Sequence, residues 1–251
     1  MNTVQISLIL FAALVAAVLL GRTVRPRLPD HHLSADSRDA VKLAMGLVAT
    51  MTALLLGLLV SSAKGTYDTQ RTEVIQMAAK VAFLDRVLTA YGPEAAEARA
   101  HFRQAVEEGV RHMWPQETRE RAQLMPNAQA GDAVYAAIQS LSPRDDTQRG
   151  LKAQAASLAV DLAQLRMLLL AQMVPSIPMP LLIAVGCWLM LIFLGFSLLA
   201  PPNATATLAL ISAALSVAVA LFLVVELDHP LGGMIRLSSE PMLNTLNHFA
   251  K

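Results

Sequence analysis

Four apolar runs without a charged residue constrain this chain more than any other feature of its sequence. They extend over residues 4–20, 43–60, 177–200 and 204–225, and none contains Asp, Glu, Lys or Arg. A bilayer core about 30 Å thick is crossed by roughly 20 apolar residues of helix. Because 55% of the chain is hydrophobic and only 16% is charged, we expect an all-α polytopic membrane protein with four transmembrane helices.

The segment between the second and third runs is hydrophilic but keeps a helical period, which predicts a water-exposed helical domain. Apolar side chains recur there every three or four residues on two stripes. The first stripe is Val74, Met77, Val81, Leu84, Leu88 and Tyr91, and the second is Leu151, Ala155, Leu158, Leu162, Leu165 and Leu169. They predict two long helices that face each other as a hairpin, like a coiled coil, with the first continuous with the second span.

Glycine and proline residues predict where these helices begin and end. Gly92 ends the first long helix, and Pro93 starts the shorter helix that follows it. Ser142-Pro143 starts the long helix that carries the second stripe. PSIPMP, residues 175–180, predicts a kink or hinge before the third span. Ser239 and Pro241 start a short interfacial helix at the C-terminus. The expected parts are therefore residues 1–60, 61–176, 177–227 and 228–251.

Positive side chains set the expected orientation in the membrane. The loop between the first two spans contains Arg22, Arg25, Arg27, Arg38 and Lys42. Lys and Arg near span ends stay on the cytoplasmic side, so this loop is expected there. Both termini and the helical domain then lie outside the cytoplasm, although the domain's own Lys64, Arg71, Lys152 and Arg166 count against this orientation.

Five short segments together resemble a family of bacterial membrane proteins labelled bestrophin-like. They are LPDHH, GLVATMTALLLGLLVSSAKGTYD, FLDRVLTAYGPEAAEAR, LLAPPN and ELDHPLGG. The resemblance implies a location in the bacterial inner membrane, four spans and a channel role, since bestrophins are pentameric anion channels with aromatic residues at the pore neck. This chain departs from that pattern, because Phe222 is the one aromatic residue of its last span and the residues that follow are acidic.

One face of the predicted fourth span carries two hydroxyls and a carboxylate within about 40° of a single line. The residues on this face are Ser212, Ser216, Val219, Leu223 and Glu226. In an oligomer this face could line a water path, and Glu226 with nearby Asp228 would attract cations at its mouth. The competing interpretation is interhelical packing, because serine and alanine let helices approach closely in lipid.

Other polar residues receive structural interpretations. Asp85 and Arg99 are expected to form an ion pair within the helical domain. Asp228 and His229 are typical of a solvated helix end, with Gly232-Gly233 as a turn. His101, Glu108 and His112 share a helical face but lack the compact spacing of a zinc site, and His31-His32 fit a polar loop. We expect no metal site.

The sequence therefore favours an oligomeric ion channel over other classes of protein. The expected partners are the lipid bilayer, further copies of the chain and inorganic ions. The alternative is a membrane-anchored structural or sensory scaffold whose helical domain binds a partner. Catalysis, a cofactor and nucleic-acid binding are not expected, because the sequence contains no nucleophile elbow, P-loop, dinucleotide fingerprint or basic run interleaved with aromatics.

Overall fold

The computed structural model describes residues 3–29, 34–114, 128–172, 177–201, 203–228 and 235–249, and no strand occurs in these ranges. The all-α prediction is therefore confirmed for the described residues. The chain divides into two compact units. The first contains residues 1–66 and 175–228, and the second contains residues 67–174 and 229–251.

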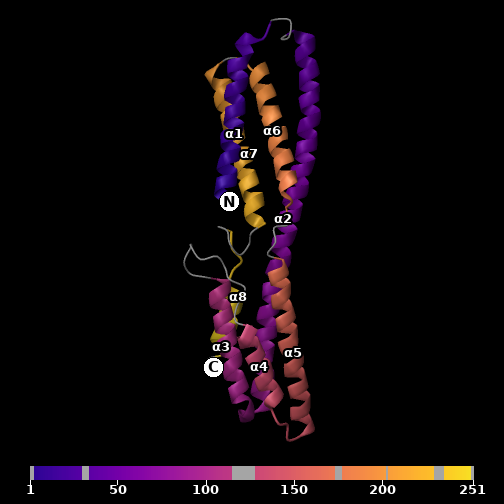
Figure 1. Ribbon diagram of the computed structural model, residues 1–251, viewed down its shortest axis with the longest axis vertical. Helices are drawn as coiled ribbons and strands as arrows, with labels where there is room; N and C mark the ends of the chain where they lie inside the picture. The colour runs from indigo at the N-terminus through magenta and orange to yellow at the C-terminus, as the bar shows by residue number, and fades with distance from the viewer. Residues whose placement is uncertain are drawn as a thin grey trace. The chain divides into compact units, whose positions relative to one another are not determined.

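The first unit is formed by helices that coincide with the four apolar runs. They are α1 (Thr3–Val24), the first half of α2 (Ala35–Tyr91), α6 (Met179–Leu199) and α7 (Ala204–Leu227), with the short turn η1 (Arg25–Arg27) after α1. Helix α1 packs against both α6 and α7, as Figure 1 shows. The core of this unit includes Leu14, Val18, Leu59, Val185 and Leu221.

Small residues bring α1 and α6 into close contact. A side-chain carbon added at Gly21 would lie 2.8 Å from Ser197 Cβ and 2.9 Å from the Leu194 carbonyl oxygen. Ser197 Oγ donates a hydrogen bond of 2.5 Å to the Val18 carbonyl oxygen. Van der Waals packing and interhelical hydrogen bonds of this kind drive helix association in lipid, where apolar burial gives no advantage.

The outward faces of the first unit are apolar. Leu43, Leu54, Ile183 and Leu208 are each at least 63% exposed. An outer surface with so many exposed leucine and isoleucine side chains would be unfavourable in water but is favourable in hydrocarbon. The first unit therefore has the surface of a membrane protein.

Within the described ranges, five helices are long and apolar enough to cross a membrane. Four are α1, α2, α6 and α7, and the fifth is α5 (Asp146–Ala171). Helix α5 contains Lys152, Asp161 and Arg166 and belongs to the second unit. The count of four spans therefore stays a prediction.

The second unit contains the rest of α2 with α3 (Ala96–Met113), α4 (Ala128–Ser140), α5 and α8 (Glu240–His248). Helix α2 continues unbroken for 57 residues, which confirms the predicted continuity beyond the second apolar run. Helices α2 and α5 run antiparallel, because Gln70 contacts Gln172, Lys80 pairs with Asp161, and Gln148 bonds the Tyr91 carbonyl.

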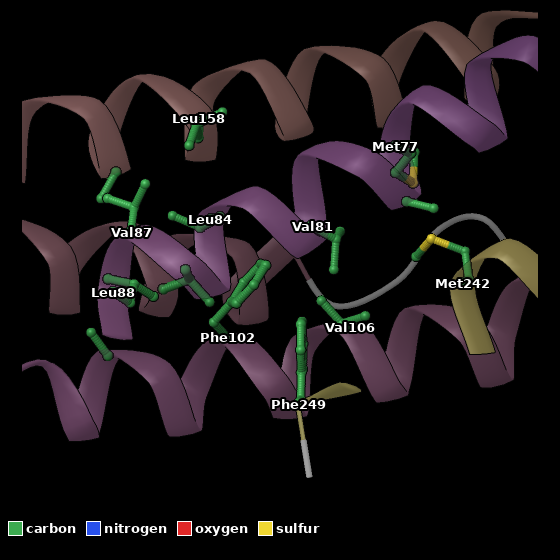
Figure 2. Packing of buried hydrophobic residues seen from close by; sticks show 14 of the residues in the cluster. Met77, Val81, Leu84, Val87, Leu88, Phe102, Val106, Leu158, Met242 and Phe249 are labelled. Atoms are coloured by element: carbon green, nitrogen blue, oxygen red, sulfur yellow. The ribbon is translucent and has the colours of Figure 1, made fainter. Parts of the chain in front are cut away.

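Both predicted apolar stripes contribute to one core in the second unit. Every member of the first stripe is buried, and Leu84 is completely inaccessible to solvent. Ala155, Leu158 and Leu169 of the second stripe are buried in the same cluster, and the other three members pack against it. Figure 2 shows Leu158 of α5 beside Leu84 and Val87 of α2.

Specific residues end α2 and begin α5. Gly92 has a φ of 115°, a backbone conformation that favours glycine, and Pro93 begins the short turn η3 (Pro93–Ala95). The predicted cap of α5 at Ser142-Pro143 is wrong, because the N-cap is Asp145. Its carboxylate accepts a hydrogen bond of 2.7 Å from the Gln148 backbone N–H.

The C-terminal tail belongs to the second unit. Leu237, Met242 and Phe249 are buried in its core, and the Phe249 ring lies 5.9 Å from that of Phe102. Trp114 Nε1 donates a hydrogen bond of 2.8 Å to the Leu237 carbonyl. The predicted short helix after Ser239 is confirmed as α8, and its buried side chains contact the apolar surface of α3 (Figure 2). Its place at the membrane interface stays a prediction.

Candidate functional site

Helix α7 has one exposed face and one buried face. It begins at Asn203, whose side-chain oxygen accepts a hydrogen bond of 2.8 Å from the Ala206 backbone N–H. Ala214, Ala218 and Leu221 are buried against the rest of the first unit. The opposite face is not covered by the chain itself and is available to lipid or to another copy.

The exposed face carries four of the five residues predicted to line an ion path. Ser212 and Ser216 are exposed, and Val219 and Leu223 are 48% and 44% exposed. The Ser216 hydroxyl donates a hydrogen bond of 3.0 Å to the Ser212 carbonyl oxygen, four residues earlier. This bond satisfies the Ser216 donor within the helix and leaves the hydroxyl oxygen able to accept from water or to ligate a cation. We call these four residues the α7 stripe.

Glu226 is buried, whereas the residues of the α7 stripe are exposed. The helical projection had placed Glu226 on the same face of α7 as the stripe. Glu226 is only 1% exposed, and its neighbours Val224 and Val225 are also buried. Protein therefore covers more of the last turn of α7, where three consecutive residues are buried, than of the middle turns. A projection of one helix cannot predict this difference, because it contains no information on which elements surround the helix end.

Asp228 follows α7 as its C-cap residue and is 6% exposed. Its Oδ2 accepts a hydrogen bond of 3.3 Å from the Ile177 backbone N–H. Ile177 precedes Pro178, the N-cap of α6, so this bond joins the end of α7 to the segment that leads into α6. Helix α7 ends at Leu227, which confirms the predicted helix end, but the expected solvation is wrong for Asp228 because protein covers its side chain. His229 and the predicted turn at Gly232-Gly233 lie outside the described residues.

Asp85 and Arg99 form the ion pair that their positions predicted. Arg99 Nε lies 2.5 Å from Asp85 Oδ1, and Nη2 lies 3.0 Å from Oδ2. This two-pronged hydrogen bond raises the pKa of Arg99, outweighing the opposite effect of burial. The pair joins α2 to α3 and has a structural role.

The predicted histidine positions do not come together as a ligand set. His101 Nε2 lies 3.8 Å from Glu97 Oε1, and His112 Nε2 lies 3.8 Å from Glu108 Oε1. Each histidine therefore faces the acidic residue one turn earlier on α3. In the described parts of the chain, no three His, Cys, Asp or Glu residues are arranged to hold a metal ion, and His31 and His32 lie outside those parts.

Sequence analysis missed a polar cluster between α2 and α5. Glu73 is 8% exposed, and its Oε1 accepts a hydrogen bond of 2.7 Å from Gln172 Nε2. Gln70 Nε2 donates to the Gln172 carbonyl oxygen at 3.2 Å. Gln70 lies one turn before Val74, on the buried side of α2. A polar residue in line with a buried apolar stripe was the signal that could have revealed it.

Comparison with known families gives one match. A family model described as a Bestrophin-like domain matches residues 12–242, which is most of the chain. No curated protein and no solved structure matches the chain.

Proposed function

Because the chain belongs to the Bestrophin-like domain family, we propose that this membrane protein assembles into an oligomeric ion channel in which copies of α7 surround the ion path. The observation that carries the proposal is the α7 stripe, whose two serines lie on the exposed side of a largely apolar helix. A face of this kind suits a narrow water path, because hydroxyl oxygens can replace part of an ion's hydration shell.

The proposed channel has four spans per chain, namely α1, the first half of α2, α6 and α7. Helix α5 is not proposed as a span, because two of its charged residues interact with charged residues of other helices in the second unit. Asp161 pairs with Lys80 of α2, and the charge of Glu108 on α3 acts on Arg166. Charged side chains are expensive in a bilayer centre, whereas these lie in a domain with its own core. The second unit then lies outside the cytoplasm, opposite the basic loop.

The acidic residues at the end of α7 are proposed to favour cations at the mouth of the path. Glu226 and Asp228 are buried within the chain, so they act through their electric field and do not bind the ion directly. A buried negative charge exerts a strong field, because the surrounding protein screens it less than water does. The proline-containing segment before α6 is proposed to transmit motion of the helical domain to this end.

The second candidate function is a membrane-anchored structural or sensory scaffold. The two apolar stripes of the helical domain are buried in its own core, so a partner would need a different surface. Met167 and Leu168 of α5 offer one, since they are 66% and 45% exposed. A scaffold of this kind requires no water path along α7.

The proposal is tested by ion flux into liposomes that contain the purified protein. Wild-type protein is expected to conduct, and Ser216→Leu should reduce the flux at least tenfold because it places a bulky apolar side chain in the path. Glu226→Gln should keep a flux but lower the preference for K⁺ over Cl⁻.

Thr50→Leu is the matched control for Ser216→Leu. Thr50 is also an exposed hydroxyl residue in an apolar helix, and its Oγ1 donates to the Gly46 carbonyl oxygen at 2.9 Å. Because Thr50 lies on α2, this variant should conduct like the wild type. Flux no greater than that of empty liposomes for K⁺, Na⁺ and Cl⁻ would contradict the channel and favour the scaffold.

A further inference from the structure

A small cavity of about 10 Å³ lies at the end of the first unit where α1 and α6 finish and α7 begins. Arg22, Arg25, Ser197, Ala206, Thr207 and Leu210 are among the residues that line it. None of the described residues that line it is acidic. The volume is close to the minimum that holds one water molecule, so a single oxygen atom of a larger group would fit.

The two arginines give this cavity a positive charge, and one of them has a donor that makes no hydrogen bond. Arg22 Nη1 makes a long contact of 3.4 Å with the Asn203 carbonyl oxygen. Arg25 Nη1 is shielded from solvent and makes no hydrogen bond within the described parts of the chain. A shielded donor without a partner costs free energy, and this cost is removed when an acceptor enters. A guanidinium group bonds most strongly to an anionic oxygen, above all in a carboxylate or phosphate.

The surroundings indicate which anion would bind. The cavity lies where three apolar helices end, which is the depth of the lipid headgroups. Ala206 and Leu210 provide an apolar wall on one side. An anion that combines a phosphate with a glycerol and acyl chains would contact both the arginines and this wall, whereas inorganic phosphate would contact only the arginines.

We propose that this cavity is a binding site for the phosphate group of an anionic membrane lipid. One phosphate oxygen enters the cavity, the Arg25 guanidinium turns so that its shielded Nη1 donates a hydrogen bond to this oxygen, and Arg22 contributes a second positive charge. The acyl chains continue along the apolar outer surface of the first unit. This inference does not depend on ion conduction, because it concerns the opposite end of α7 from Glu226.

The test measures lipid retention by the purified protein in neutral detergent, with native mass spectrometry as the readout. Phosphatidylglycerol is titrated against phosphatidylcholine, whose choline group cancels the phosphate charge. Wild-type protein should retain phosphatidylglycerol preferentially. Arg25→Gln should lower its affinity about tenfold, the effect of losing one charge-assisted hydrogen bond.

Arg27→Gln is the matched control, because it removes one positive charge from the same turn. Arg27 is exposed, donates to the Thr23 carbonyl oxygen at 2.9 Å, and does not line the cavity. Its affinity for phosphatidylglycerol should stay within about twofold of the wild type. Equal losses in the two variants would overturn the site and indicate general attraction between a basic loop and anionic lipid.

Two further arms keep the test decisive. If Arg25→Gln does not fold, Ala206→Leu fills the cavity without changing charge and should produce the same loss of affinity. Inorganic phosphate is titrated as a competitor, and it should displace the lipid only weakly because it lacks the contact with the apolar wall. Equal binding of both lipids, or full displacement by inorganic phosphate at the lipid's own concentration, would overturn the proposal.

Discussion

The two units of this protein are both helical bundles, but their helices are held together by different interactions. The second unit buries large side chains such as Leu84, Leu88 and Ile138 in a continuous core and adds ion pairs such as Asp85–Arg99. In the first unit, α1 and α6 meet where a glycine faces a serine, while leucines point outward. The difference agrees with the proposed four-span arrangement, because burial of apolar side chains stabilises a fold in water and gives no such advantage in hydrocarbon.

This comparison has a consequence for function. Serines on an exposed helix face are ordinary in water but require an explanation on the outside of an apolar bundle. The proposed channel explains them by close packing against a second copy and by contact with a water path. The α7 stripe places two exposed serines one turn apart, whereas Thr50 of α2 has no hydroxyl residue one turn away, so the stripe is the surface of the first unit on which the channel proposal rests.

The largest effect is expected for Leu84→Ala in the core of the second unit. Leu84 is 0% exposed, so the substitution creates a cavity and should lower the free energy of unfolding by about 3 kcal/mol. Ile75→Ala on the same helix, where the side chain is 47% exposed, should cost less than about 1 kcal/mol. Chemical denaturation of the two variants measures both, and equal costs would contradict the assigned core.

A smaller effect is expected for Gly21→Ala in the first unit. The added methyl would overlap Ser197 and the Leu194 carbonyl, so α1 and α6 must separate, at a cost of about 2 kcal/mol. Gly57→Ala has no neighbour within 4 Å and should be neutral or slightly stabilising. Unfolding in mixed micelles with increasing denaturing detergent measures both variants. A neutral Gly21→Ala would show that close packing does not hold this pair together.

The smallest effect is expected for Asp85→Ala, which breaks the ion pair between α2 and α3. Its cost should be about 1.5 kcal/mol, between the values for surface and buried pairs, because the Arg99 side chain is 37% exposed and can turn to water. Asp146→Ala is the control, since that side chain is 91% exposed in its pair with Arg149. The unfolding temperature should fall measurably for Asp85→Ala and hardly change for Asp146→Ala.

Much of the fold was predictable because it depends on local patterns. The apolar runs of α1, α6 and α7 and the buried stripe of α2 require only composition and a helical period. Gly92 was likewise predictable as a helix end. In contrast, the cap of α5 depends on which side chain reaches the first turn of the helix, and the structure has Asp145 there in place of the predicted Ser142.

The rest depended on contacts between distant parts of the chain. The burial of Phe249 against Phe102 requires that the tail meet α3, and no local pattern specifies that meeting. The same is true of Glu226, whose angle on α7 was correctly projected but whose surroundings were not. A helical projection predicts the direction in which a side chain leaves its helix. The exposure of that side chain depends on the elements packed around the helix.

The most direct test of the proposed ion path is the accessibility of the α7 stripe to a water-soluble reagent. Ser216→Cys and Thr50→Cys are each introduced after Cys187, the single native cysteine, has been replaced by alanine. Both variants are treated in liposomes with a membrane-impermeant cationic thiol reagent. The account predicts rapid modification at position 216 with a change in ion flux, and no modification at position 50. Equal resistance at both positions would contradict a water path along α7.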